Sequence, residues 1–292
     1  MLQLTTITRL LFNQSSLVAV KHGVRSLQTL LNFTDAQRLK HLAQSLAVAP
    51  LLERQPRFRY KYLSRYLAAS FSRTTRLKTI LNHYQFLAEK TRPAFFTQLP
   101  HQPVIWHEAW DDSSFTISLS YPKYVGYEGE LSLNFCLNST LLQVISFVIV
   151  PGQVVGAVGA HALLFGQVQG TRNAALLRQA TKTLHDITPA ALLVNAAYGL
   201  AEALGIGHAA GVSTAEQLCY RTGSCFDYDG FWQQFGGQPT VHNLFLLDIP
   251  AAEKPLAEVK TKHRARTLRK RQYKQQLRAT IAAQFGVMFL VE

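Results

Sequence analysis

The residues with the clearest chemical potential follow a strand-like run that ends at Gly170. Gln169, Gly170, Thr171 and Arg172 stand between this run and a segment with helical spacing. Backbone amides that are freed at such a turn, together with the first turn of a helix, form a site for a pyrophosphate group. An ordinary strand-to-helix turn without a ligand is the alternative, and the sequence leaves both open.

Two further side chains are candidates for acid–base chemistry. His185 ends the helical segment, and imidazole exchanges protons near neutral pH. A histidine that only completes a helix C-terminus is the competing interpretation. Asp227 and Asp229 lie among Phe226, Phe231 and Trp232. This segment predicts either a recognition surface with two carboxylates or a loop held in the core by its aromatic side chains.

Other reactive patterns are incomplete. Residues 211–215 are close to the elbow that exposes a serine nucleophile, but Ala215 replaces its last glycine and no acid–histidine pair follows in a recognisable context. His107 and Glu108 lack the second histidine of a zinc-binding HExxH helix, so a surface strand or loop is expected there. The cysteines have no CxxC spacing and are expected as reduced thiols, with no metal site: Cys136, Cys219 and Cys225.

The elements that position these residues follow from hydrophobic periodicity. Residues 1–95 have helical spacing, and Asp35 opens a helix that runs through Leu46. After Pro103 the period changes to two and predicts three successive strands, of which the nearly apolar run 141–150 belongs at the centre of a sheet. The remaining core elements are a strand to Gly170, helices over 174–185 and 189–205, the second capped by Thr188, and a strand over 208–213.

This order of elements predicts an α+β fold with a mixed central sheet. Its strand–helix–helix–strand unit resembles the coenzyme A site of Gcn5-related (GNAT) acetyltransferases, whose motif reads Gln or Arg, two residues, Gly, one residue, then Gly or Ala. Arg172 stands at the last of these positions. The resemblance implies acyl-CoA as a cofactor of a transferase-like core, with its pyrophosphate against Gly170, Thr171 and Arg172. The chain is divided into a helical region over 1–95 and an α+β core over 96–292 that ends in a basic helix.

Positive charge is concentrated in two places. The formal net charge is +13, with nine Lys or Arg residues from Lys260 to Arg278 and a second cluster from Arg54 to Lys78. Such surfaces predict an anionic partner: a phospholipid surface, nucleic acid or a phosphorylated ligand. In the second cluster the aromatic residues suit stacked bases, or else amphipathic helices with Tyr62 and Tyr66 facing the core.

No segment has the length of a membrane span. The apolar run 144–150 falls far short of the roughly 20 residues that are needed. Arg9 and Asn13 interrupt the apolar stretch that a signal peptide requires. A cytoplasmic protein is therefore expected.

Short motifs in order along the chain resemble the VirK/YbjX family of Gram-negative bacterial proteins, whose domain has no assigned function. They include Lys61 to Leu67, His83-Tyr84, Glu128 to Leu131, Gln169-Gly170, Thr181-Lys182, Leu184-His185, Val212-Ser213, Tyr228-Asp229, Phe231-Trp232, Gly236-Gly237 and the basic tail. Family members usually read Gly-Leu-Arg-Pro where this chain has Asp186-Ile187-Thr188-Pro189. They often carry Asn at Thr214 and Glu at Gln234.

The resemblance implies an accessory role in virulence and in tolerance of envelope stress or cationic antimicrobial peptides, at the inner face of the membrane. An acyl-CoA-dependent transferase is the most concrete reaction that the sequence suggests. A non-enzymatic adaptor that binds nucleic acid or anionic lipid through the basic segments is the alternative.

Overall fold

A computed structural model describes residues 33–43, 45, 48–49, 56–122, 126–218 and 226–291. The chain divides into two compact units, residues 1–64 and 65–292. The described part of the first unit contains helix α3 (Phe33–Ala43) and the 3-10 helix η1 (Pro56–Leu63). The helix predicted from Asp35 is therefore present, whereas Leu46 lies outside the described residues.

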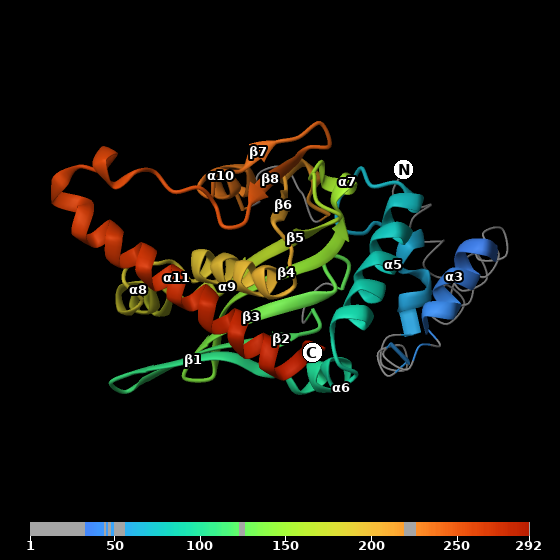
Figure 1. The fold of residues 1–292 in the computed structure, drawn as a ribbon, viewed down its shortest axis with the longest axis horizontal. Coiled ribbons are helices and arrows are strands. Elements are labelled where there is room, and N and C mark those ends of the chain that lie inside the picture. Colours follow the sequence, from blue (N-terminus) through green and yellow to red (C-terminus); the bar gives the residue numbers. More distant parts are fainter. Residues whose placement is uncertain are drawn as a thin grey trace, which may run out of the picture. The chain divides into compact units, whose positions relative to one another are not determined.

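The second unit is built on one mixed sheet (Figure 1). Its eight strands in the described chain are β1 (Val104–Trp110), β2 (Ser113–Ser120), β3 (Leu131–Leu137), β4 (Thr140–Pro151), β5 (His161–Gly170), β6 (His208–Val212), β7 (Gln238–Pro239) and β8 (Leu244–Asp248). They lie in the order β1-β2-β3-β4-β5-β6-β8-β7, and only β5 and β6 are parallel neighbours among them. The predicted α+β class, mixed sheet and central place of 141–150 are confirmed.

The helices of this unit are α5 (Arg73–Lys90), α6 (Ala94–Gln98), α7 (Gly152–Val155), α8 (Ala174–Thr183), α9 (Pro189–Ala203), α10 (Tyr228–Gln233) and α11 (Thr261–Phe289). Short 3-10 turns occur at Leu99–His101, Thr214–Glu216 and Leu256–Glu258. Thr188 accepts a hydrogen bond from the amide of Ala191 and Pro189 occupies the first turn of α9, as predicted. Helix α5 contacts strand β4. The predicted domain boundary between residues 95 and 96 stays a prediction.

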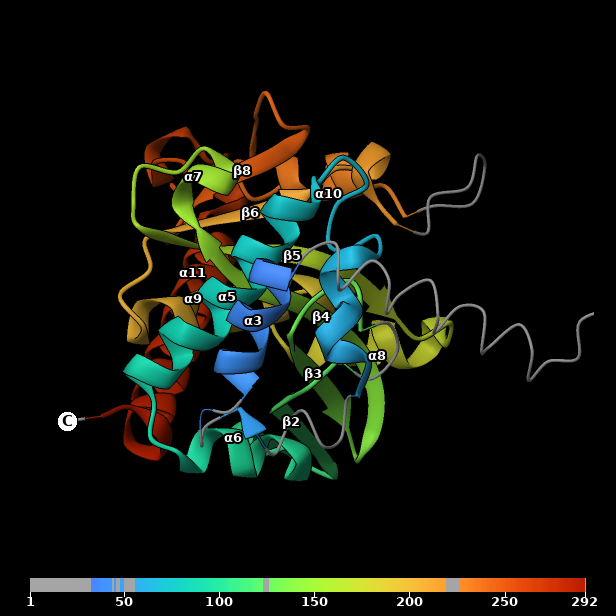
Figure 2. The ribbon, with the colours of Figure 1, turned by 90° about the vertical axis from the view of Figure 1, so that its right-hand side faces the viewer.

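Helices α9 and α11 pack against each other over the sheet, and the two views show them together on one side of the strands (Figures 1 and 2). Their close approach depends on a small residue in α9. A Cβ at Gly199 would lie 2.7 Å from the carbonyl oxygen of Arg278 and 3.2 Å from Ile281. Gly199 therefore allows the two helices to approach this closely where they cross.

One face of the sheet is unusual because it is both buried and polar. On β3, Ser132 and Asn134 alternate with buried leucines and are themselves fully buried. The hydroxyls of Ser132 and Ser146 are 2.7 Å apart, Ser146 is linked to Gln167, and Asn134 donates to Ser120 at 2.9 Å. These hydrogen bonds run across neighbouring strands and offset the cost of burying polar groups.

A buried carboxylate connects this sheet to α5 and to the segment before it. Glu130 is 1% exposed and accepts hydrogen bonds from the hydroxyls of Tyr66, at 2.5 Å, and Tyr84, at 2.6 Å. Next to Tyr84, the Nδ1 atom of His83 accepts the amide of Ile149 on β4 at 3.1 Å. Hydrogen bonds to two hydroxyls stabilise a carboxylate that has left water.

Gly211 on β6 has its Cα against a buried aromatic ring. A Cβ there would lie 2.0 Å from Trp232, which stacks on Phe165 at 5.3 Å and donates its Nε1 proton to the carbonyl oxygen of Val212. We therefore expect Gly211→Ala to lower the free energy of unfolding by about 3 kcal/mol, because the ring must move. Denaturant unfolding measures this loss. Gly207→Ala is the control, since no atom lies within 4 Å of its added Cβ, and an equal loss in both variants would contradict this account.

Candidate functional site

The turn predicted to hold a cofactor lies where the sequence places it. Strand β5 ends at Gly170 and α8 begins at Ala174, with Asn173 accepting the amide of Leu176 at 3.2 Å. The amide of Thr171 donates to the carbonyl oxygen of Leu142 at 2.8 Å, which holds the turn against β4. Gln169, Gly170 and Arg172 are exposed, and the side chain of Gln169 accepts a hydrogen bond from Gln167 of the polar sheet face.

The gap between β5 and β6 beyond their ladder is filled by side chains of the chain itself. Their pairing stops at Phe165 and Gly211. Beyond it the carbonyl oxygen of Gly166 accepts the Nε2 of Gln217 at 2.9 Å, and the amide of Val168 donates to the hydroxyl of Tyr228 at 3.2 Å. A ligand arm that entered between these strands would have to displace both side chains.

Asp229 has a structural partner next to this gap. Its carboxylate accepts the amide of Thr214 at 2.7 Å, and the hydroxyl of Thr214 accepts the amide of Tyr228 at 3.2 Å. This reciprocal pair fixes the start of α10 after the end of β6. Phe231 and Trp232 are buried, whereas Phe226 is 46% exposed, so only part of the aromatic segment is held in the core.

Ser213, the serine of the elbow-like pattern, accepts the amide of Glu216 at 3.3 Å and caps a short turn.

His185 lies away from Gly170 and Asp229. Helix α8, with ten residues and a length of roughly 15 Å, separates it from the Gly170 turn. The His185 ring packs between Trp110 of β1, with ring centroids 5.7 Å apart, and Tyr273 of α11, at 4.9 Å. The predicted site residues therefore fall in two places, and His185 belongs to the surroundings of the basic helix.

Carboxylates near His185 hold the middle of α11. Glu108 accepts hydrogen bonds from the hydroxyl of Tyr273, at 2.8 Å, and from Nε1 of Trp110. Burial raises the pKa of the Tyr273 hydroxyl, and the hydrogen bond to Glu108 raises this pKa further. Asp186 pairs with Arg266 at 2.7 Å and its carbonyl oxygen accepts the ammonium of Lys270 at 2.8 Å. Glu108, Trp110 and Tyr273 could not be assigned from the sequence, because up to 165 positions separate them.

Helix α11 has two halves with different surroundings. Its second half buries a stripe of side chains spaced four residues apart, Leu277, Ile281, Phe285 and Phe289. We call its first part, residues 261–271, the cationic helix end. Lys262, Arg264, Arg266 and Arg269 are all exposed there, and α11 has no acidic residue.

Part of the basic charge on α11 is neutralised. Three of its cations pair with carboxylates in the described chain: Arg266 with Asp186, Arg271 with Glu253 at 2.8 Å, and Arg278 with Glu202 at 3.3 Å. Burial lowers the pKa of Lys270, and the neighbouring charge of Arg266 lowers it further. The helix therefore carries more positive charge than its neighbours compensate.

The described residues contain no group of three His, Cys, Asp or Glu side chains that could hold a metal ion. Cys136 is half-buried on β3, and Cys219 and Cys225 lie outside the described residues. No helix of the described chain is long and apolar enough to cross a membrane.

Comparison with known proteins assigns the chain to a family. The family described as "Protein of unknown function (DUF535)", which is the VirK/YbjX family, matches residues 21–283. The chain belongs to this family. Tyr66, Tyr84 and Glu130, which belong to three of the short motifs named above, form one buried network in the structure.

Three curated relatives show the range of the family. The chain is 27% identical to "Uncharacterized protein YbjX" of Escherichia coli K12 over 80% of this chain and 74% of that protein. It is 29% identical to an "Uncharacterized protein" of Haemophilus influenzae over 67% of this chain and 66% of that one. It is 27% identical to "Membrane protein LapB" of Mannheimia haemolytica over 56% of this chain and 69% of that one. No solved structure matches the chain, so no structural comparison supports the predicted GNAT-like core.

The backbone after α8 adopts a left-handed conformation. Asp186 has φ of 60°, in the region that glycine adopts without a steric cost. His185 before it has φ of 53°. Here the strained position holds a carboxylate that pairs with Arg266.

We expect Asp186→Gly to change the free energy of unfolding by less than about 1 kcal/mol. The relief of left-handed strain offsets the loss of an ion pair whose two side chains are 60% and 41% exposed. Asp186→Val loses the same pair and adds a β-branched side chain at positive φ, so it should cost about 2 kcal/mol. Thermal unfolding of both variants checks this, and equal losses would contradict it.

Proposed function

We propose that this DUF535 protein binds anionic phospholipid surfaces as a peripheral protein, through the cationic helix end. The observation that carries the proposal is the division of α11. Its second half is fixed by a buried apolar stripe, whereas its first three turns carry exposed cations and extend beyond α9 (Figure 1). A helix held in this way presents its charges to a surface at little further cost in conformational entropy.

Apolar side chains beside these cations favour a lipid surface over nucleic acid. Leu268 on the cationic helix end is 42% exposed, and Trp110, beside His185, is 39% exposed. Cationic side chains together with Leu and Trp suit the boundary between head groups and acyl chains. The name of the relative LapB, a membrane protein, agrees with this choice. In this proposal the protein works at the inner face of the membrane, where it supports envelope-stress or antimicrobial-peptide tolerance.

Flotation of the full chain with vesicles tests the proposal. Binding to vesicles that contain phosphatidylglycerol should be strong at low salt and should weaken steeply as salt is added. Vesicles of phosphatidylcholine alone should bind little. Failure to float with either composition would remove the proposal, and tighter binding to RNA than to anionic vesicles would favour the nucleic-acid adaptor.

Acyl-CoA-dependent transfer is the second candidate, and one observation supports it. The turn from Gly170 to Arg172 is exposed and opens directly into α8, whose first amides face the end of a strand. The side chains of Gln217 and Tyr228 in the adjacent gap weigh against it. Calorimetric titration with coenzyme A tests this candidate, with Gly170→Glu as the control. Binding of coenzyme A by the wild type that this substitution abolishes would support the transferase function.

A further inference from the structure

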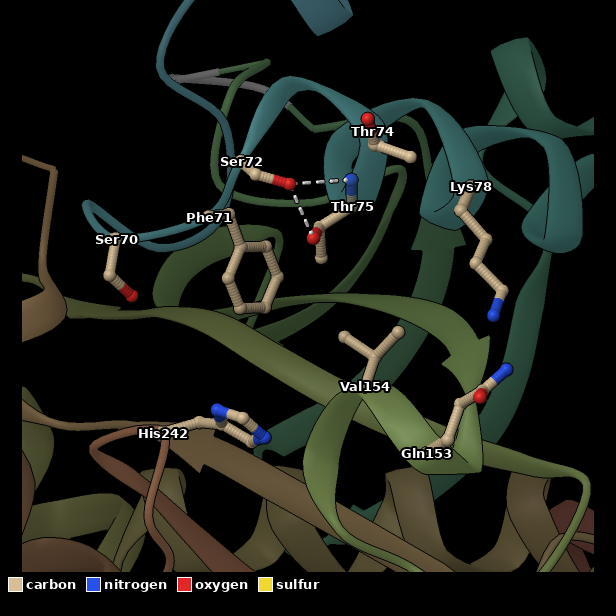
Figure 3. Close-up of a pocket in the computed structure, with 9 residues that line it drawn as sticks. All are labelled: Ser70, Phe71, Ser72, Thr74, Thr75, Lys78, Gln153, Val154 and His242. Atoms are coloured by element: carbon tan, nitrogen blue, oxygen red, sulfur yellow. Dashed lines mark hydrogen bonds between the residues drawn. The ribbon is translucent and has the colours of Figure 1, made fainter.

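A separate cavity lies at the junction of three elements in the second unit. Its volume is about 360 Å³, within the range of cavities that hold small ligands. Its polar groups come from the region of α5, from α7 and from the turn between β7 and β8: Ser70, Ser72, Thr74, Thr75, Lys78, Gln153 and His242. Figure 3 shows the ammonium of Lys78 near the amide of Gln153, with the His242 ring at the opposite side of the hollow.

The chemistry of this lining selects an anion. Among the described residues that line the cavity none is Asp or Glu, whereas Lys78 brings a positive charge. Four hydroxyl side chains also line it, of which those of Ser72 and Thr75 are hydrogen-bonded to each other at 2.8 Å. The ring of Phe71 and the side chain of Val154 face the same hollow and form an apolar wall (Figure 3). A ligand that contacts both the polar wall and the apolar wall has a compact anionic group on a small carbon frame.

Positive charge gathers beside the cavity. Helix α5 has no acidic residue in its first turn, although carboxylates are the residues that the positive end of a helix favours. It has Arg73 and Arg76 there instead, and Lys78 follows in the second turn. These side chains favour an anion at this end of α5.

Two walls of the cavity are fixed by hydrogen bonds that they donate to a buried carboxylate. Glu216, 5% exposed, accepts the amide of Ser70 at 2.8 Å and the side-chain amide of Asn243, the neighbour of His242, at 3.4 Å. The hydroxyl of Thr240 accepts the amide of His242 at 3.3 Å. The two sides that carry Ser70 and His242 are therefore tied to one group, and the cavity exists before any ligand enters.

From this geometry we propose that the cavity binds a phosphomonoester of a small carbon compound. Lys78 and Gln153 hold the phosphate from one side of the cavity, His242 donates from the opposite wall, and Phe71 with Val154 contacts the carbon frame. The site is independent of the cationic helix end. A soluble metabolite and a lipid head group share this chemistry, and the choice of probes separates them.

Calorimetric titration of the full chain with glycerol 3-phosphate tests the proposal, with inorganic phosphate and glycerol as comparison ligands at equal ionic strength. Saturable binding of glycerol 3-phosphate is expected below about 1 mM, tighter than that of inorganic phosphate, with no binding of glycerol. Lys78→Ala and His242→Ala should each weaken it at least about tenfold. Lys90→Ala, an exposed lysine at the far end of the same helix, should leave it unchanged.

Both test residues are exposed, so the variants are expected to fold, and their melting temperatures provide the check. No saturable binding by the wild type, or equal weakening by Lys90→Ala, would overturn the proposal. If vesicles with an exposed phosphomonoester lipid compete with glycerol 3-phosphate, the natural ligand class is a head group; if they do not, it is a soluble compound. Lys78→Ala should leave binding to phosphatidylglycerol vesicles intact, which keeps this test distinct from that of the proposed function.

Discussion

The double variant Lys262→Glu with Arg269→Glu is expected to bind anionic vesicles roughly a thousandfold more weakly than the wild type. The two reversals change the charge of the cationic helix end by four units, and each charge near an anionic bilayer contributes about 1 kcal/mol. Both side chains are exposed and α11 is anchored by its second half, so the fold should persist. Vesicle flotation over a range of lipid concentrations measures the loss.

The control for this variant has the same net charge. Lys40→Glu with Lys90→Glu reverses two exposed lysines elsewhere in the described chain. If net charge alone drew the protein to the membrane, both double variants would lose the same amount. The control variant should lose less than about threefold in affinity for anionic vesicles. Equal losses of affinity in both double variants would refute a role for this helix.

The second large effect is expected at the buried carboxylate. Glu130→Ala should lower the free energy of unfolding by about 3 kcal/mol or more, because it leaves the hydroxyls of Tyr66 and Tyr84 without their acceptor and opens a cavity. Glu130→Gln keeps an acceptor oxygen and the volume, so about 1 kcal/mol is expected. Urea unfolding gives both values. If the alanine and glutamine variants were equally stable, the two hydroxyl contacts would not be the source of the stabilisation.

The same tyrosines predict how stability changes at alkaline pH. Burial raises the pKa of Tyr66 and Tyr84 well above the usual value of about 10, and the charge of Glu130 raises both further. Above about pH 10 the unfolded chain therefore loses protons that the folded chain keeps, and the free energy of unfolding falls as pH rises. Tyr66→Phe with Tyr84→Phe should flatten this fall. An unchanged slope between about pH 9 and pH 11 would contradict the assignment.

Local patterns in the sequence predict much of the second unit. The period-two runs give β2, β3 and β4, and the strand to Gly170, the capped helix at Pro189 and the strand at 208–213 are all present. These elements obey local rules, since alternation, an N-cap and a glycine stop each act within a few residues. Strand β8 was missed because its five residues follow a loop-rich segment, and its pairing with β6 spans about forty positions of chain.

The candidate sites were harder to predict because they depend on contacts between distant residues. The ring of His185 meets Trp110 and Tyr273, which lie 75 and 88 positions away, and no spacing rule joins them. The cavity at Lys78 gathers side chains from residues 70 to 242 for the same reason. The sequence alone did predict that the basic tail forms a cationic surface. That Arg266 and Arg271 pair with carboxylates is seen only in the structure.

Hydrogen–deuterium exchange of the full chain, with and without phosphatidylglycerol vesicles, tests the central claim most directly. The amides of residues 261–271 lie at an exposed helix end and should exchange rapidly in the free protein. The account predicts that vesicles slow their exchange, that added salt reverses the effect, and that the buried second half of α11 changes little. Slowed exchange elsewhere in the chain without any change at residues 261–271 would contradict it.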